Sequence, residues 1–283
     1  MPDSSDSKDV RHVRTLFLSD VHLGMRPTRI GQLVDFLKHH EADTIYLIGD
    51  ILDGWRLARS WYWPPIYNEF VEDLLGKALR GTRLVVLPGN HDEFLREYLG
   101  TYFGEVEFVD RTVHTTALGR TYLVMHGDQF DVVVVHAKWL AHVGDWAYRM
   151  ALRINIFINW VRRRLRRPYW SLSAWAKNKV KNAVSVIGRF EEALTLEARD
   201  TGVDGVICGH IHFADMHDRL GIHYINTGDW VESCTAVCET HDGQFELIKW
   251  NVQPGLPPKP PREKRGLRLR RRKAPSGLDA SAP

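Results

Sequence analysis

The feature that most constrains the fold is a rhythm in which a short apolar run ends abruptly in a chemically active side chain. It occurs five times, in TLFLSDVHLG, TIYLIGDILDGW, RLVVLPGNHDEF, TYLVMHGDQFD and, much later, GVICGHIHFAD. Each run is rich in leucine and β-branched residues, which is typical of a short buried strand. The chain is therefore predicted to form a sheet whose strands end in functional groups.

Segments of helical character separate the first of these runs. IGQLVDFLKHH places Ile30, Leu33, Val34 and Leu37 on one helical face, and YNEFVEDLLGKAL has a similar apolar face. Strands that alternate with helices predict an α/β fold in which helices cover the sheet. Ligands of such sheets bind beyond the carboxyl ends of the strands, where all five polar groups are expected.

The character of the chain changes after the fourth run. From about residue 132 to 199 the strand pattern disappears, and this helix-compatible segment holds five of the ten tryptophans. We predict that it is a helical cap inserted into one domain spanning residues 13–250. Residues 1–12 and the proline-rich, basic residues 251–283 have little to bury and are predicted to be disordered.

The sequence predicts a cytoplasmic protein. The first ten residues, MPDSSDSKDV, lack the apolar core of a signal peptide. No apolar run approaches the roughly 18 residues that a membrane-spanning helix needs. Cys234 and Cys238 stand four residues apart, but a zinc site needs four ligands and the sequence has no second such pair. These two cysteines and Cys208 are therefore predicted to be buried thiols.

The strand-end side chains form one set of oxygen and imidazole ligands: Asp20, His22, Asp50, Asn90, His126, His210 and His212. Seven ligands suffice for two divalent cations if one carboxylate bridges them. Two cations about 4 Å apart can clamp a phosphoryl group and activate water for attack. A set without thiolates favours manganese, iron or zinc over calcium. A single Asp or His at a strand end is usually a cap, but five such motifs in order predict a two-metal phosphoester hydrolase.

The order D-x-H, G-D, G-N-H-D, H-G-D, G-H-x-H resembles the calcineurin-like metallophosphoesterase superfamily across roughly residues 13–250. The resemblance implies a two-sheet sandwich flanked by helices. It also implies one metal held by Asp20, His22, Asp50 and His212, and a second held by Asp50, Asn90, His126 and His210. His91 would then face the scissile phosphate, as a charge stabiliser or an acid for the leaving group, and Asp92 would orient His91.

Within that superfamily the chain is similar to the UDP-2,3-diacylglucosamine diphosphatases of lipid A synthesis. Four features carry this resemblance: the motif SDVHLG, the motif GDILDGW with Asp53 and Trp55, the Trp-rich insertion after HGD, and the late GHIH. It implies a manganese enzyme at the inner face of the bacterial inner membrane, with a cap that holds acyl chains. Water would attack the phosphate on the uridine side, releasing UMP and the acylated sugar 1-phosphate. His91 departs from the arginine of well-known members, so another lipid-linked or nucleotide phosphoester stays open as the substrate.

The insertion contains a strongly basic stretch, NWVRRRLRRPYW, with five arginines between Arg162 and Arg167. An apolar stripe runs beside it at helical spacing, through Ile154, Ile158, Val161 and Leu165. A basic amphipathic helix is typical of proteins that bind an anionic membrane surface. The alternative is a cap helix that packs on the sandwich and leaves its basic face in solvent.

Downstream of the arginines, YWSLSAWAKNKVKNAV places Lys177 and Lys181 four residues apart, with Ser173 one turn earlier. If that face lines the cleft, these three side chains and Asn90 would bind the substrate's diphosphate. The alternative is that the lysines are ordinary exposed side chains.

Three other functions compete with the lipid-nucleotide hydrolase. A soluble phosphodiesterase or phosphatase acting on nucleotides or phosphoproteins would have little use for an apolar, Trp-rich cap. A nucleic-acid-binding protein or nuclease is disfavoured by the net charge of only +3 and by the lack of a recognised nucleic-acid module. A non-catalytic scaffold is disfavoured because all seven ligand positions are filled.

Overall fold

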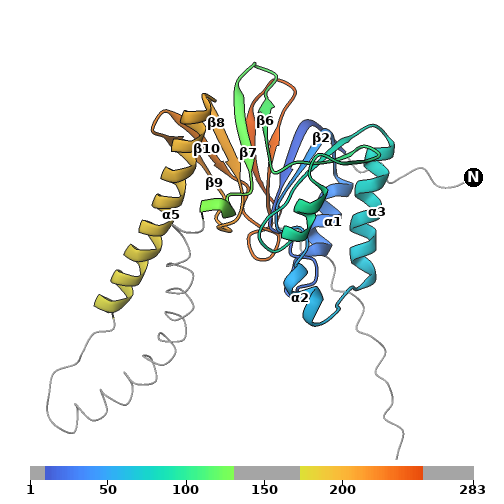
Figure 1. The fold of residues 1–283 in the computed structure, drawn as a ribbon, viewed down its shortest axis with the longest axis horizontal. Coiled ribbons are helices and arrows are strands. Elements are labelled where there is room, and N and C mark those ends of the chain that lie inside the picture. Colours follow the sequence, from blue (N-terminus) through green and yellow to red (C-terminus); the bar gives the residue numbers. More distant parts are fainter. Residues whose placement is uncertain (1–9, 131–172, 251–283) are drawn as a thin grey trace, which may run out of the picture. The chain divides into compact units, whose positions relative to one another are not determined.

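The computed structural model describes residues 10–130 and 173–250, with side chains in the latter range described from Ile187 onward, and it contains two sheets (Figure 1). The first sheet has seven strands in the order β12 (Phe245–Lys249), β11 (Thr235–Glu239), β1 (Arg11–Leu18), β2 (His40–Ile48), β3 (Arg83–Leu87), β5 (Val106–Phe108) and β4 (Tyr102–Phe103). The second has five strands in the order β6 (Arg111–Thr115), β7 (Thr121–Met125), β8 (Gly205–Cys208), β10 (Ile222–Asn226) and β9 (Asp215–Arg219).

Parallel pairing brings the motif-bearing ends together within each sheet. β1, β2 and β3 are mutually parallel, as are β7, β8 and β10. Because parallel strands end at the same edge, the residues after β1, β2 and β3 share one edge, and those after β7 and β8 share another. The predicted α/β two-sheet fold is confirmed.

The two sheets pack face to face through an apolar layer. Phe17, Tyr46, Val124 and Ile225 belong to this layer, and the Phe17 and Tyr46 rings stack with centroids 5.1 Å apart. Burial of such side chains contributes roughly 1.5–3 kcal/mol each, which makes this layer a main source of stability. The sheets therefore hold their polar ends at fixed positions relative to each other.

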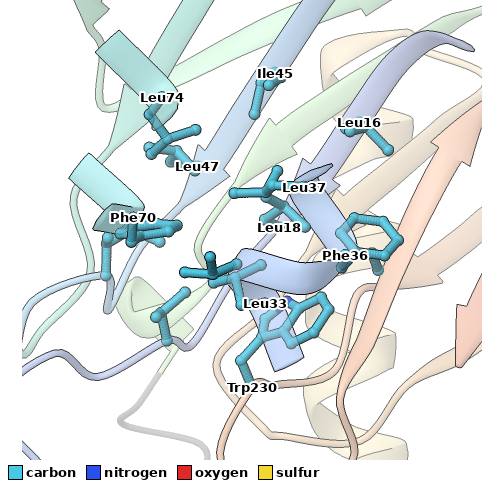
Figure 2. Close-up of a cluster of buried hydrophobic side chains, with 14 of the residues drawn as sticks. Leu16, Leu18, Leu33, Phe36, Leu37, Ile45, Leu47, Phe70, Leu74 and Trp230 are labelled. Carbon is cyan, nitrogen blue, oxygen red and sulfur yellow. The ribbon is translucent and has the colours of Figure 1, made fainter. Parts of the chain in front are cut away.

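Helices cover the outer faces of the sheets. α1 (Ile30–Lys38) and α3 (Pro65–Leu79) pack on the first sheet through a core that includes Phe36, Phe70 and Trp230 (Figure 2). On the second sheet, α5 (Ser173–Thr201) buries Phe190 and Leu194. The short helix α2 (Gly54–Arg59) and the 3-10 turns η1 (Glu93–Tyr98) and η2 (Asp128–Phe130) follow three of the motifs.

The first strand begins at Arg11, two residues before the predicted start of the domain. α5 covers the last part of the predicted insertion, while residues 132–172, with the arginine-rich stretch, and the basic tail 251–283 lie outside the described residues. All three cysteines are free and buried, as predicted, and burial raises the pKa of Cys208 to about 12. No helix in the described ranges is long and apolar enough to cross a membrane.

An ion network around the buried Glu239 joins the two sheets beside the middle of β1. Glu239 of β11 accepts hydrogen bonds from His114 Nε2 (2.7 Å), an Arg14 guanidinium nitrogen (2.6 Å) and the Ala117 amide (2.7 Å). Burial raises the pKa of Glu239, but these donors outweigh it and lower the pKa to about 2. The charged carboxylate thus binds its partners more strongly in the folded protein than it binds water in the unfolded chain.

Replacing Glu239 with glutamine is expected to lower the free energy of unfolding by about 3 kcal/mol at pH 7, because the Arg14 guanidinium loses its counter-charge and His114 and the Ala117 amide lose a charged acceptor. A carboxylate with a lowered pKa stabilises the fold above its unfolded pKa, and this contribution fades as the pH falls from about 4.5 toward 2. Urea unfolding across this range measures both effects. The exposed Glu246→Gln is the control, and equal unfolding curves for the two variants would refute the account.

Candidate metal centre

The predicted ligands emerge from the ends of five strands in both sheets. Asp20 and His22 follow β1, Asp50 follows β2, and Asn90 follows β3. From the second sheet, His126 follows β7, and His210 and His212 follow β8. Each strand is buried at its end, so the chain enters these loops from a rigid support.

Three groups of potential ligand atoms form where these loops meet, and within each group the atoms lie within 4.8 Å of one another. The groups are Asp20, His22 and His212; His22, Asp50 and His91; and Asp50, His126 and His210. Six of the seven predicted ligands are thus brought together, and His91 joins them. Residues up to 192 positions apart in the chain (20 to 212) meet in one place.

Asp50 lies between the two sides of this cluster. Its Oδ2 is 3.7 Å from His22 Nε2, whereas its Oδ1 is 3.5 Å from His126 Nε2. On the first side, His212 Nε2 lies 3.0 Å from Asp20 Oδ1 and 3.2 Å from His22 Nε2. One carboxylate that turns an oxygen to each side is the arrangement that a bridge between two cations requires.

Five of the predicted ligands have a left-handed backbone. The φ angles are +52° at Asp20, +53° at His22, +54° at Asp50, +72° at His210 and +53° at His212. A residue other than glycine rarely adopts this conformation, which costs of order 1–3 kcal/mol where it is strained, and such residues gather at functional sites. The strand ends are therefore shaped to aim these side chains, a feature that the sequence did not reveal.

Glycines let the loops approach the carboxylates closely. A Cβ at Gly89 would stand 2.3 Å from Asp50 Oδ1, and one at Gly209 would stand 2.5 Å from Asp20 Oδ2. Both distances are far inside normal contact, so any side chain would push the carboxylates away. This steric need explains the glycine in each of the motifs G-N-H-D and G-H-x-H.

The two carboxylates are buried yet charged. Burial raises the pKa of each, but neighbouring imidazoles outweigh it, so the pKa of Asp20 is well below its usual range and that of Asp50 falls to about 2. For His126 the balance is opposite: burial lowers its pKa, and the carboxylates of Asp50 and Asp20 raise it to about 10. The centre thus combines full negative charge with imidazoles that would release protons to a cation.

The donor set fits divalent cations. Asn90 Oδ1 is shielded from solvent and has no hydrogen-bond partner among the described residues, which is costly for a buried amide oxygen unless a ligand completes it. His126 Nδ1 donates to the carbonyl oxygen of Ile48 (2.9 Å), which orients the opposite ring nitrogen toward Asp50. Carboxylate, amide and imidazole donors without thiolate suit manganese, iron or zinc.

The structure differs from the expectation that Asp92 orients His91. Asp92 is fully buried and accepts hydrogen bonds from four backbone amides, those of Asp50, Ile51, Leu52 and Gly89. It therefore ties the G-D loop to the G-N-H-D loop. Asp53 follows the end of β2 and Asp92 follows the end of β3, and sequence spacing alone does not show which of these carboxylates faces the His91 imidazole.

The side chain that faces His91 is Asp53, whose Oδ1 lies 3.3 Å from His91 Nδ1. Asp53 also caps α2 by accepting the Arg56 amide at 2.9 Å, which fixes the carboxylate in place. On another side, the half-exposed Trp55 ring packs on His91 with centroids 4.3 Å apart. The sequence signal for both was GDILDGW, in which Asp53 comes three residues after Asp50.

The remaining predicted site residues lie on α5. Ser173, Lys177 and Lys181 fall in its first three turns, and their side chains lie outside the described part of the structure. Further along the helix, Phe190 packs on the His210 ring with centroids 5.9 Å apart. Sequence analysis missed this apolar contact, which closes one side of the centre.

Comparison with known proteins places these motifs in context. The family model of the calcineurin-like phosphoesterases matches residues 13–214. A UDP-2,3-diacylglucosamine hydrolase of Chromohalobacter salexigens is 29% identical over 228 residues, which cover 76% of this chain and 88% of that protein. The enzyme of the same name from Cellvibrio japonicus is 26% identical over 234 residues, covering 77% and 91% of the two chains. A solution structure of a Thermotoga maritima protein overlays loosely, with a TM-score of 0.41 and 14% identity over 84% of this chain and 99% of that one.

Proposed function

The chain belongs to the calcineurin-like phosphoesterase family, and from this premise we propose that it is a two-metal hydrolase of UDP-2,3-diacylglucosamine or a closely related lipid-linked nucleotide. The products would be UMP and the acylated sugar 1-phosphate. Family membership supports a metal-dependent phosphoester hydrolase. The proposed diphosphate substrate is supported by the relatives named UDP-2,3-diacylglucosamine hydrolase.

The observation that supports the two-metal site best is the position of Asp50 between two groups of ligands. Asp20, His22, Asp50 and His212 would hold one cation, and Asp50, Asn90, His126 and His210 the other. When bound, two divalent cations polarise a phosphoryl group and lower the pKa of an attacking water. We propose manganese, with iron and zinc as alternatives of the same donor preference.

His91 is proposed to act on the departing group. Its amide donates to Asp50 Oδ1 at 2.8 Å, which anchors the residue at the rim of the cluster. The Asp53 carboxylate lies 3.3 Å from Nδ1, and in this proposal Nε2 faces the substrate, where it can donate a proton or hydrogen bond to the leaving oxygen. Asp92 acts indirectly in this proposal, by fixing the backbone of both loops.

The remaining parts of the proposal concern substrate binding and location. The insertion at about 132–199 would cap the centre and hold acyl chains, with Ser173, Lys177 and Lys181 near the diphosphate. The protein would work in the cytoplasm, peripherally on the inner face of the inner membrane, where an anionic surface meets its basic residues. The net charge of +3 is modest, so nucleic acid is not the proposed partner.

Release of UMP from UDP-2,3-diacylglucosamine in detergent micelles with Mn²⁺ tests the substrate. We expect a kcat/KM on this substrate at least 10³-fold above that on bis(p-nitrophenyl) phosphate, because remote binding of acyl chains and uridine stabilises the transition state. His91 stands where well-known relatives carry arginine, and this favours one second candidate, another lipid-linked or nucleotide phosphoester. Turnover of the simple diester without UMP release would retain the hydrolase and reject the proposed substrate.

A further inference from the structure

A basic aromatic surface lies beside the centre and takes no part in it. It comprises Arg26, Arg29, Arg56, Arg59 and Trp61, all of them exposed, and is called here the α2 surface. The arginines come from two segments, the loop before α1 and the helix α2 (Figure 1). The centre's ligands come from other residues, so the chemistry leaves this surface unexplained.

Contacts from α2, from the segment after it and from α3 hold the loop that carries Arg26. The Arg26 guanidinium lies over the Tyr62 ring, 5.1 Å from its centroid, and the Tyr67 hydroxyl donates to the Met25 carbonyl oxygen at 2.9 Å. The Leu57 side chain packs so closely on Gly24 that a Cβ there would meet it at 2.8 Å. The loop and the helix therefore lie against each other, and all four of their arginines are exposed.

Trp61 projects from this face. It is 74% exposed, and its ring stacks on Trp63 with centroids 5.7 Å apart and planes 21° from parallel. Trp63 is fixed in turn, because its indole nitrogen donates to Asn68 Oδ1 at 2.8 Å. Single exposed apolar side chains are common on protein surfaces, but this ring is fixed by Trp63 and follows the exposed Arg56 and Arg59, so it offers a partner an apolar and a cationic contact together.

The charge of the α2 surface indicates which partner. Residues 24–29 and 54–64 contain four arginines and no carboxylate, although the whole chain carries only three more basic than acidic side chains. Arginine attracts anionic lipid headgroups, and tryptophan prefers the interface between headgroups and acyl chains. A bilayer satisfies both kinds of side chain at once, whereas a nucleic acid would leave Trp61 dependent on an unpaired base.

We propose that the α2 surface docks the protein on an anionic bilayer with the Trp61 ring inserted at the headgroup level. This docking proposal rests on the proposed function, because a lipid-linked substrate gives the protein a reason to bind a bilayer. α2 is six residues long, about 9 Å, and its first turn is capped by Asp53 beside His91. Docking through α2 would therefore hold the centre close to the plane in which a lipid-linked phosphoester lies.

A fluorescent label tests this contact directly. Because the three native cysteines are buried, an NBD probe can be placed on Ser60→Cys, next to Trp61, and separately on Asp218→Cys as a control on β9. The full-length protein is titrated with vesicles of phosphatidylglycerol and phosphatidylcholine and with vesicles of phosphatidylcholine alone. We expect a blue shift and a severalfold rise in emission for the Ser60 probe on anionic vesicles only, and no change for the Asp218 probe.

Two variants show whether the named side chains cause the shift. Arg56→Glu with Arg59→Glu, and Trp61→Ser, should each weaken the response of the Ser60 probe at least tenfold. Arg120→Glu with Arg199→Glu is the charge-matched control and should reduce it far less. Hydrolysis of bis(p-nitrophenyl) phosphate should be unchanged in all variants, which shows that the centre is intact.

Other results would overturn the proposal. If vesicles sediment the protein but the Ser60 probe is silent, another segment, such as the basic tail, makes the contact. A response to short DNA or RNA and not to vesicles would assign the surface to nucleic acid, and equal responses to neutral vesicles would reject the charge argument. Vesicle binding is measured without turnover, so a failure of the proposed substrate leaves this test unaffected.

Discussion

Replacing Asp50 with asparagine is expected to lower kcat/KM by at least about 10³-fold, equivalent to roughly 4 kcal/mol of transition-state stabilisation. The amide keeps the shape of the side chain but removes the negative charge that two cations would share in the proposed site. Asp50 turns one oxygen toward His22 and the other toward His126, so the substitution affects both groups at once. Bound metal, measured by mass spectrometry after gel filtration, should fall to one ion per chain or fewer.

Asp218→Asn is the matched control for Asp50→Asn, because it makes the same chemical change on the exposed surface of β9. It should keep full activity and full metal content. Circular dichroism and thermal unfolding of both variants separate a lost cation from a lost fold. Retention of wild-type hydrolysis by a folded Asp50→Asn protein would remove Asp50 from the mechanism.

Replacing His91 with asparagine is expected to lower kcat by about 10²–10⁴-fold, the usual range for a lost general acid, while metal content is kept. Asp53→Asn should have a smaller effect, about 10–100-fold, because Asp53 acts by orienting His91. Substrates with different leaving groups show whether His91 supplies the proton. A substrate that releases p-nitrophenolate needs little protonation, so the loss caused by His91→Asn should shrink on that substrate.

Equal losses on good and poor leaving groups would show that His91 stabilises charge and does not supply the proton. Asp92→Asn provides a useful contrast, since Asp92 holds four backbone amides and does not face the imidazole. It should lower stability and metal affinity together. A leaving-group effect in Asp92→Asn as strong as that in Asp53→Asn would contradict the assignment of the two carboxylates.

The sequence predicted which side chains lie close together, because parallel strands end at the same edge of a sheet. Buried runs that end in Asp20, Asp50 or His126 can place those side chains only at the edge where parallel strands finish. Six of the seven predicted ligands do meet there, within groups of atoms less than 5 Å apart. Apolar residues at helical spacing also located α1 and α3, because this spacing places them on one helical face that packs on the sheet.

The backbone conformation and the side-chain contacts at the centre could not be predicted from the sequence. Asp and His adopt the left-handed region more readily than most residues, but nothing in the motifs shows that five of the ligands do so. The choice of Asp53 over Asp92 as the partner of His91 depends on where α2 begins. The contact of Phe190 with His210 joins residues of a helix and a loop whose packing no periodicity specifies. Trp61 belongs to none of the five motifs, and the sequence does not show that its ring is exposed.

The most direct test of the central claim is the number and coupling of the bound cations in the unmodified protein. The chain is loaded with Mn²⁺, freed of excess metal by gel filtration, and measured by elemental analysis and electron paramagnetic resonance. A centre bridged by Asp50 predicts two ions per chain and the spectrum of an exchange-coupled pair. One ion per chain, or two with the six-line signals of isolated Mn²⁺, would contradict a shared two-metal site.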